Sequence, residues 1–250
     1  MNTTIKIGNF GFVNNFLPYY WLEQNGARVI EASPRKLAEK FEKGEVDFAP
    51  VPSFYYIKNK DKLRSYDFCI ASRNSVLSVI LVSEGKMLDD GCIAVTNQTL
   101  TSVNLLKIIL SERGRKNKVA RVDESKASEL LKHCTYALVI GDEAIKARMK
   151  YRVVMDLGEE WRDLTGYPMV FGIAVSRKER DMSEVNKAVM ESTAWGKRNA
   201  DVVVAEAAKK FGMPVEFLRE YFKTLTYQMG AEERRGLELF EEKCYEYGLL

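Results

Sequence analysis

Short apolar runs alternate with amphipathic segments along the first 180 residues, and this pattern predicts strands separated by helices. The series begins with strands at residues 5–10, 28–32 and 46–51 and helices at residues 17–25 and 33–44. The second helix is well delimited, because Ser33 suits its N-cap, Pro34 its first turn and Gly44 its end. The strand at 46–51 has little polar alternation, which is typical of a sheet covered on both faces and joined by parallel crossovers.

A polar segment at residues 84–91 carries two glycines and is the expected boundary between two lobes. Two β runs precede it, at residues 66–73 and 76–83. A second series follows, with strands at 93–96, 136–140, 153–157 and 170–175 and helices at 101–113, at 142–150 and around Trp161. From Asp181 onward the pattern predicts helices at 182–197, 199–211, 214–224 and 231–247.

These elements predict an α/β protein of two lobes followed by a C-terminal helical segment. Lobe 1 is expected to comprise residues 1–88 and 176–250, and lobe 2 residues 89–175. A small ligand is expected in a cleft between the lobes, near the carboxyl ends of strands and the amino ends of helices. The helical tail is expected to brace a lobe or to form a dimer face, which leaves monomer and homodimer as alternatives.

The composition is that of an ordinary folded protein of 250 residues, with 46% apolar and 29% charged residues. Lys and Arg total 38 and Asp and Glu total 35, so the net charge of +3 is too balanced to indicate a nucleic-acid partner. No window approaches 18 consecutive apolar residues, and residues 1–5 lack the basic start of a secretory signal. We therefore expect a cytoplasmic protein with no membrane partner.

The cysteines and the single histidine give no sign of a metal centre. Four cysteines are scattered without a CxxC pair, and we expect them to be small buried hydrophobic residues: Cys69, Cys92, Cys134 and Cys244. His133 lies in a polar helix end and is expected at the surface. The sequence contains no P-loop, GxGxxG, HExxH or GxSxG motif, so no cofactor and no metal are expected.

Several polar residues lie where a predicted strand meets a helix. Thr99, Thr101 and Ser102 open a helix, where they bind a carboxylate or simply cap the helix. Asp142 likewise is either a cap or a carboxylate in the cleft. Local hydrogen bonding explains each of these residues as well as ligand binding does, so their positions alone do not assign them a role.

Asparagines and serines near the first and fifth strands raise the same alternatives. Asn14 and Asn15 precede Pro18 and either orient a polar ligand or close a turn. Ser75 and Ser78 flank an apolar pair, and a buried Ser78 needs a hydrogen-bond partner.

Residues 156–172 read Asp-Leu-Gly-Glu-Glu-Trp-Arg-Asp-Leu-Thr-Gly-Tyr-Pro-Met-Val-Phe-Gly. This segment resembles the chorismate dehydratases of the futalosine route to menaquinone, whose pattern there is D-L-G-x-E-W followed by T-G-x-P-x-V-F. Further segments agree in order, at residues 7–14, 44–52, 70–79, 96–103 and 140–144. The resemblance covers roughly residues 5–180.

The resemblance implies a fold like that of type-2 periplasmic binding proteins, with mixed sheets. It also implies that water is eliminated from chorismate to give 3-[(1-carboxyvinyl)oxy]benzoate: a proton leaves ring carbon 3 and hydroxide leaves carbon 4. Aromatisation drives this step, so the protein mainly has to hold the conformer and stabilise the leaving group.

The resemblance also suggests roles for individual residues. Asn14 would hydrogen-bond the substrate near the reacting ring, and Ser78 would orient a proton transfer or the leaving hydroxyl. A substrate carboxylate is one hypothesis for the proton acceptor. Thr99, Thr101 and Ser102 would bind a substrate carboxylate, and Asn15, Ser75 and Asp142 would be further substrate contacts.

The chain departs from the family pattern at three places. Asn9 stands where the family has arginine, and Asn74 where glycine is usual. Arg73 is a candidate to replace the lost positive charge. Asn15 keeps the family's spacing to Pro18, which makes it a rival to Asn14. A divergent dehydratase, a binding protein of the same fold without activity, and the sister 1,4-dihydroxy-6-naphthoate synthase are the alternatives.

Overall fold

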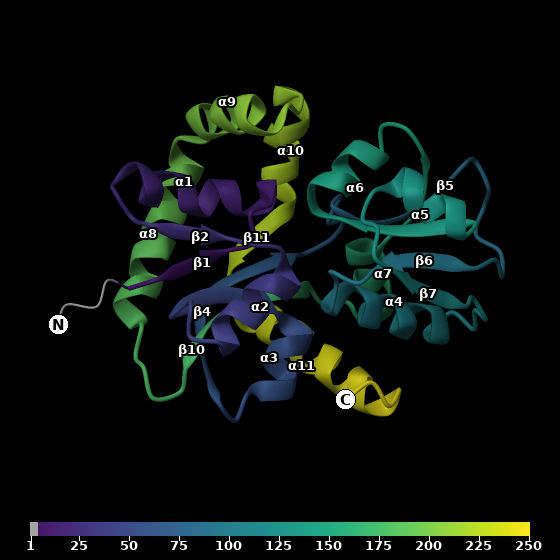
Figure 1. Cartoon of the computed structure of the whole chain (residues 1–250), viewed down its shortest axis with the longest axis horizontal. Helices are drawn as coiled ribbons and strands as arrows, with labels where there is room; N and C mark the ends of the chain where they lie inside the picture. Colours follow the sequence, from purple (N-terminus) through teal and green to yellow (C-terminus); the bar gives the residue numbers. More distant parts are fainter. Residues whose placement is uncertain (1–4) are drawn as a thin grey trace. The chain divides into compact units, whose positions relative to one another are not determined.

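The computed structural model describes residues 5–250 (Figure 1). Residues 1–4, on which the expectation of a missing secretory signal partly rests, lie outside this range. The described chain divides into two compact units. Unit 1 comprises the chain up to Ala71 together with Val170–Ala231, and unit 2 comprises Ser72–Met169 and Glu232–Leu250. In the described part of the chain, none of the helices has the length and apolar character needed to cross a membrane.

Unit 1 is built on a mixed six-stranded sheet with the order β11-β4-β10-β3-β1-β2. Its elements are β1 (Ile7–Asn9), η1 (Val13–Asn15), α1 (Phe16–Gln24), β2 (Val29–Glu31), α2 (Pro34–Glu42), β3 (Phe48–Pro52), α3 (Ser53–Asn59), β4 (Leu63–Ser72), β10 (Met169–Arg177), α8 (Ser183–Arg198), α9 (Ala200–Phe211), α10 (Val215–Thr224) and β11 (Leu225–Gln228). β1 is parallel to β2 and β3, as expected, and β10 is antiparallel to β3.

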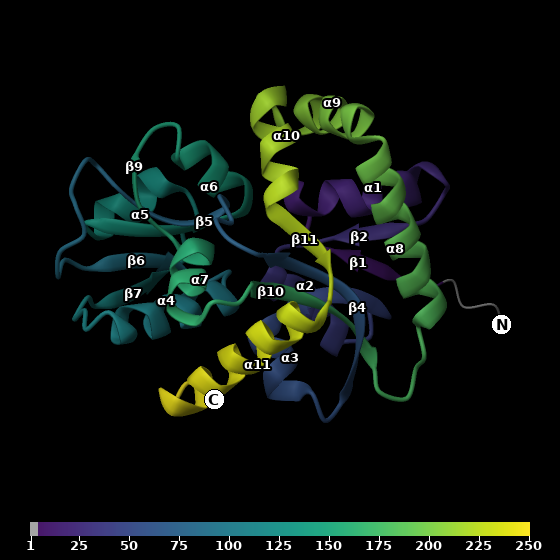
Figure 2. The same ribbon diagram turned by 180° about the vertical axis from the view of Figure 1, so that it is seen from behind.

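Helices α1 and α8 of unit 1 pack side by side, as Figures 1 and 2 both show. The close approach depends on Gly196 of α8, because a Cβ at this position would lie 2.7 Å from the carbonyl oxygen of Leu17 in α1. α2 begins as predicted, with Ser33 at the N-cap position and Pro34 in the first turn. Its apolar face, which includes Phe41, is buried.

Unit 2 is built on a mixed five-stranded sheet with the order β7-β6-β8-β5-β9. Its elements are β5 (Val79–Ser83), β6 (Ile93–Thr96), α4 (Thr101–Glu112), β7 (Val119–Val122), α5 (Ala127–His133), β8 (Tyr136–Ile140), α6 (Gly141–Ala147), β9 (Arg152–Asp156), α7 (Leu157–Thr165) and α11 (Ala231–Glu246). β6 is parallel to β7 and β8, whereas β5 is antiparallel to both β8 and β9. The carboxyl ends of β6, β8 and β9 therefore lie at one end of this sheet, where β5 begins.

The unit boundaries differ from the expected lobes in three places. β5 belongs to unit 2, because it pairs with β8 and β9 along its length. β10 belongs to unit 1, because it pairs with β3 from Gly172 to Ser176. The last helix, α11, belongs to unit 2, where the ring of Phe240 packs edge-on against Trp161 of α7 at 6.0 Å between centroids. The expected assignment of the whole helical tail to lobe 1 is corrected by this contact.

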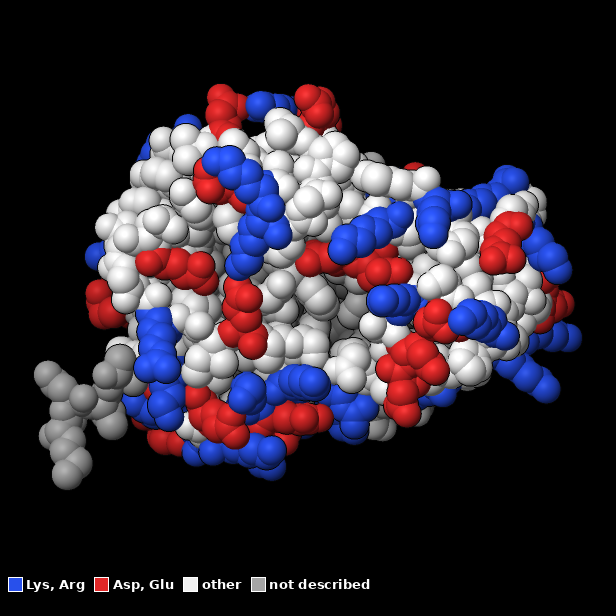
Figure 3. All heavy atoms as spheres, turned by 45° about the horizontal axis from the view of Figure 1, so that its top comes forward, with Lys and Arg blue, Asp and Glu red and all other residues white. Residues whose placement is uncertain are grey.

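Basic and acidic side chains are interspersed on the face drawn in Figure 3, in keeping with the balanced net charge. His133 is exposed, as expected. Its Nε2 lies 3.7 Å from a carboxylate oxygen of Glu124.

Two of the four cysteines form a disulfide, which the sequence analysis did not predict. Cys92 and Cys134 are bonded, with their Cα atoms 5.1 Å apart. They lie just before the neighbouring parallel strands β6 and β8, whose first residues are in register. Cys69 and Cys244 are free and buried, which agrees with the expected hydrophobic role, and burial raises the pKa of the Cys244 thiol to about 12.

We expect reduction of the Cys92–Cys134 disulfide to lower the free energy of unfolding of unit 2 by about 2–4 kcal/mol, because the bond closes a long loop in the unfolded chain. The two cysteines are 42 positions apart in the sequence. Urea denaturation with and without a reductant measures the change. The double variant Cys92→Ser/Cys134→Ser is the control and should not respond to the reductant. An identical midpoint for the oxidised and reduced wild-type protein would contradict the prediction.

Candidate functional site

In unit 1, the candidate asparagines lie at the junction of η1 and α1. Asn14 is partly exposed, and its backbone carbonyl accepts a hydrogen bond of 2.7 Å from the Tyr227 hydroxyl. Asn15 is fully buried at the N-cap position of α1, but its side chain forms no capping hydrogen bond. Neither polar atom of the Asn15 side chain has a hydrogen-bond partner, so the alternative in which this side chain closes a turn does not describe Asn15.

Buried polar atoms without a hydrogen-bond partner concentrate in this same stretch of unit 1. Among the described side chains, five buried nitrogen or oxygen atoms lack a partner, and four of the five belong to Asn14, Asn15 and Tyr19. Burial also raises the pKa of the Tyr19 hydroxyl, with the Glu23 carboxylate adding to the effect. An unpaired buried polar group costs roughly 1–3 kcal/mol. These atoms can still accept or donate a hydrogen bond to a partner from outside the protein.

Asn9 has a structural role in the first turn of unit 1. Its side-chain oxygen accepts a 2.9 Å hydrogen bond from the backbone N–H of Gly11, whose φ of +70° favours glycine. Asn9 itself is almost fully buried. The position at which the resemblance implies arginine therefore holds a turn together in this chain.

In unit 2, Ser78 lies at the end of a short loop, residues 73–78, that we call the Ser78 loop. The sequence pattern predicted a strand from residue 76, but β5 begins only at Val79. Leu77 departs from strand geometry with a φ of +62°, the one positive φ of a non-glycine residue in the described chain. Ser78 is 3% exposed, and its hydroxyl forms a long hydrogen bond of 3.4 Å to the Val76 carbonyl.

The Ser78 loop is bonded to Asp156, the first residue of the segment that carries the resemblance. One carboxylate oxygen of Asp156 accepts from the backbone N–H of Val76 at 2.9 Å. The other accepts from the Ser75 hydroxyl and from the Leu77 N–H, both at 2.8 Å. Asp156 also caps α7 and is buried. Asp156 was not among the predicted site residues, although an aspartate directly before a predicted helix is a typical capping signal.

The other candidates of unit 2 lie at the end of the sheet where Ser78 lies. Thr99, Thr101 and Ser102 follow β6, and all three are buried. The N-cap residue of α4 is Leu100, which forms no side-chain capping bond. Asp142 follows β8 and lies in the first turn of α6, where Ile140 occupies the N-cap position, so Asp142 does not cap that helix.

Arg73 is held by a buried carboxylate of its own unit. Its Nε donates a 2.9 Å hydrogen bond to Glu233 of α11, whose side chain is 1% exposed, whereas the Arg73 side chain is 62% exposed. This hydrogen bond raises the pKa of Arg73. The contact fixes the Nε edge of the guanidinium while most of the side chain remains accessible.

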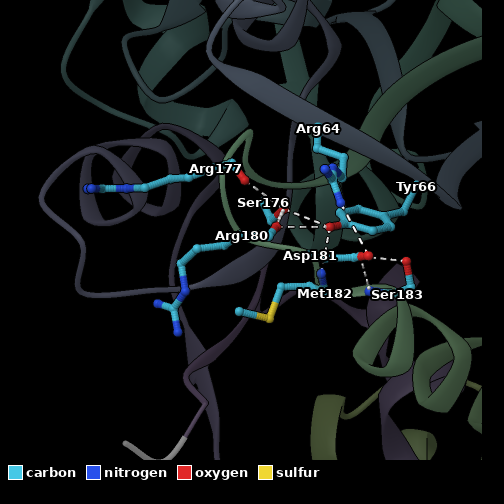
Figure 4. Close-up of polar contacts among 8 residues, drawn as sticks. All are labelled: Arg64, Tyr66, Ser176, Arg177, Arg180, Asp181, Met182 and Ser183. Carbon is cyan, nitrogen blue, oxygen red and sulfur yellow. Dashed lines mark hydrogen bonds and ion pairs between the residues drawn. The ribbon is translucent and has the colours of Figure 1, made fainter.

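A second polar cluster, in unit 1, has a structural role (Figure 4). The hydroxyls of Tyr66 and Ser176 lie 2.7 Å apart, and both contact the backbone carbonyl of Arg180. The Tyr66 hydroxyl also accepts a hydrogen bond from the Met182 N–H. These contacts close the turn between β10 and α8.

The fold places the chain among proteins with the architecture of periplasmic binding proteins. A solved structure of a protein from Archaeoglobus fulgidus matches with a TM-score of 0.81 at 19% identity, covering 98% of both chains. The periplasmic aliphatic sulphonate binding protein from Escherichia coli matches with a TM-score of 0.69 at 13% identity, covering 98% of this chain and 88% of that one. A Candida albicans protein described as having the generic periplasmic-binding-protein fold matches with a TM-score of 0.72 at 11% identity, covering 99% and 91%. The predicted fold class is confirmed.

The sequence defines the family more closely. Residues 5–246 match the family described as menaquinone biosynthesis. A chorismate dehydratase from Thermus thermophilus is 30% identical over 243 residues, which cover 90% of this chain and 89% of that protein. The chain therefore belongs to the menaquinone biosynthesis family, as the resemblance implied.

Proposed function

We propose that this protein is a chorismate dehydratase, a hydro-lyase of menaquinone biosynthesis. The observation that carries the proposal is the identity of 30% to a chorismate dehydratase over nine-tenths of the chain. The family match over residues 5–246 supports the same pathway. The fold alone does not choose between an enzyme and a binding protein, because structures with this architecture include binding proteins.

The chemistry of the proposed reaction asks for positioning rather than for electron transfer. The C–H bond at ring carbon 3 and the C–O bond at carbon 4 break, and the proton and the hydroxide leave as water. The ring becomes aromatic with no net oxidation or reduction, so the reaction needs no redox cofactor. Holding the reactive conformer supplies about 7–11 kcal/mol of the barrier reduction in favourable cases, and a well-placed donor to the leaving oxygen supplies about 3–4 kcal/mol.

The proposed roles follow from the contacts within each unit. In unit 1, Asn14 hydrogen-bonds the substrate near the reacting ring. The unpaired Oδ1 of Asn14 supports this role. Asn15 is a further substrate contact. In unit 2, Ser78 donates a hydrogen bond to the leaving hydroxyl. Neither side chain is a strong base at neutral pH, so we propose that a carboxylate of chorismate accepts the proton.

Two groups of residues are proposed for the carboxylates of chorismate. Thr99, Thr101 and Ser102 bind one carboxylate at the amino end of α4, which is supported by the lack of a side-chain cap there. Arg73 binds the other, which is supported by its exposed side chain and its firm attachment to Glu233. Ser75 is assigned to the Ser78 loop, because its hydroxyl is bonded to Asp156. Asp142 stays a proposed substrate contact.

Incubation of the purified protein with chorismate, followed by chromatography with ultraviolet detection, tests the proposal. We expect chorismate to disappear and an aromatic product with the mass of 3-[(1-carboxyvinyl)oxy]benzoate to form. Stabilisation of the protein by chorismate without any product would indicate the alternative, a binding protein of the same fold. Turnover of a cyclic futalosine derivative instead of chorismate would indicate the sister synthase.

A further inference from the structure

We propose that Asp156 is a positioning residue for Ser78: its carboxylate holds the Ser78 loop in the one backbone conformation that aims the Ser78 hydroxyl. The role for Ser78 rests on the proposed function, but the geometry of the loop does not. Asp156 accepts five hydrogen bonds, and only two of them, from Gly158 and Glu159, belong to the capping of α7. The other three come from the Ser78 loop, about 80 positions earlier in the sequence.

The hydrogen bonds to Asp156 act on the residue just before Ser78. Leu77 has a positive φ, which is unfavourable for a residue with a Cβ, so its conformation needs external support. The support comes from both sides of the residue. The Leu77 N–H is bonded to Asp156 at 2.8 Å, and the Leu77 carbonyl accepts from a guanidinium nitrogen of Arg148 at 3.0 Å. The next carbonyl, that of Ser78, accepts from the Gly141 N–H at 2.8 Å.

The start of α7 is shaped to receive this loop. A Cβ at Gly158 would lie 2.6 Å from the Asn74 carbonyl oxygen and 3.0 Å from the Val76 nitrogen. Glycine therefore lets the loop lie directly against the first turn of α7, where the Asp156 carboxylate can reach three of its donors. This contact gives a physical reason for an Asp-x-Gly sequence at residues 156–158 that helix capping alone does not provide.

The substitution Asp156→Asn separates positioning from capping. Asparagine caps helices as well as aspartate does, and its oxygen can keep the three bonds from Val76, Gly158 and Glu159. Its amide nitrogen then replaces the oxygen that faces Ser75 and Leu77. The Ser75 hydroxyl can rotate and accept a hydrogen bond instead, but the Leu77 N–H meets another donor. The variant therefore removes support from Leu77 alone.

We expect Asp156→Asn to lower kcat for chorismate at least tenfold, with KM within about threefold of wild type. Adding Leu77→Gly to this variant should recover at least threefold of the lost kcat, because glycine adopts a positive φ without support. Asp163→Asn, which changes an exposed aspartate of the same helix, is the matched control and should leave kcat unchanged. An unchanged kcat in Asp156→Asn, or a loss that only follows the folded fraction and is not rescued by Leu77→Gly, would overturn the proposal.

Amide hydrogen exchange decides the positioning claim independently of turnover. In Asp156→Asn we expect the Leu77 amide to exchange at least tenfold faster, while the amides of Gly158 and Glu159 keep their wild-type rates. An unchanged Leu77 rate would refute the claim even in an active enzyme. If the wild-type protein forms no product from chorismate but the Leu77 amide responds as expected, the proposed function fails and the assignment of Asp156 as the support of the loop stands.

Discussion

Replacing Ser78 by alanine should lower kcat for chorismate by about 100- to 1000-fold, the usual loss when one preorganised donor to a developing charge is removed. The proposed hydrogen bond to the leaving hydroxyl strengthens only as the C–O bond breaks, so KM should stay within a few-fold of wild type. Steady-state kinetics on the purified variant measure both quantities. The hydroxyl donates a long hydrogen bond of 3.4 Å to the Val76 carbonyl, and alanine fills nearly the same space, so we expect unit 2 to stay folded.

Ser111→Ala is the matched control for Ser78→Ala, because Ser111 is an exposed serine of α4 in the same unit. We expect this control to keep the wild-type kcat. Wild-type turnover in Ser78→Ala would reject the role of the hydroxyl. A loss of activity that merely parallels a loss of folded protein, measured by circular dichroism, would assign Ser78 to stability instead.

Replacing Asn14 by alanine should lower kcat/KM for chorismate by about 100-fold without lowering the thermal stability of the protein. The lower kcat/KM and the unchanged thermal stability are expected for the same reason. The Asn14 Oδ1 is buried without a protein partner, so the side chain contributes little to the folded state that alanine would lose. The backbone carbonyl that binds Tyr227 is retained in the variant. Kinetics and thermal unfolding of the same sample test both parts.

Asn25→Ala serves as the control for Asn14→Ala, because Asn25 is an exposed asparagine at the end of α1 whose side chain donates to the Trp21 carbonyl. It should keep wild-type activity. Asn15→Leu tests the rival residue, since leucine has the same branching and number of side-chain heavy atoms as asparagine and needs no hydrogen bonds. A large loss of turnover in Asn15→Leu together with normal turnover in Asn14→Ala would exchange the two proposed roles.

Most strands and helices were predictable from the sequence because their apolar pattern is local. The strands Ile93–Thr96 and Tyr136–Ile140 begin and end at the predicted residues, since each is a continuous apolar run between polar segments. The strand Val119–Val122 and the helix Ala127–His133 were not predicted. They lie in a polar segment of the sequence, and the strand is only partly buried. α3 was not predicted, because it is a short helix that follows directly on the strand Phe48–Pro52.

The Ser78 loop and the disulfide depend on contacts between distant parts of the chain. Val76 and Leu77 are as apolar as the strand that follows, and the bonds to Asp156, far along the sequence, show why the chain turns there. The pairing of Cys92 with Cys134 likewise depends on the register of β6 and β8, which no spacing motif reveals. The candidate residues Asn14 and Ser78 came from the family resemblance, because local pattern alone favoured turns and strand hydroxyls at these positions.

The most direct test of the proposed function is a product balance for chorismate with the purified wild-type protein. Proton magnetic resonance can count chorismate consumed and 3-[(1-carboxyvinyl)oxy]benzoate formed in one sample. We expect one mole of product for each mole of chorismate lost, at a rate far above that of a sample without protein. Chorismate that persists unchanged, or that disappears into other products, would contradict it.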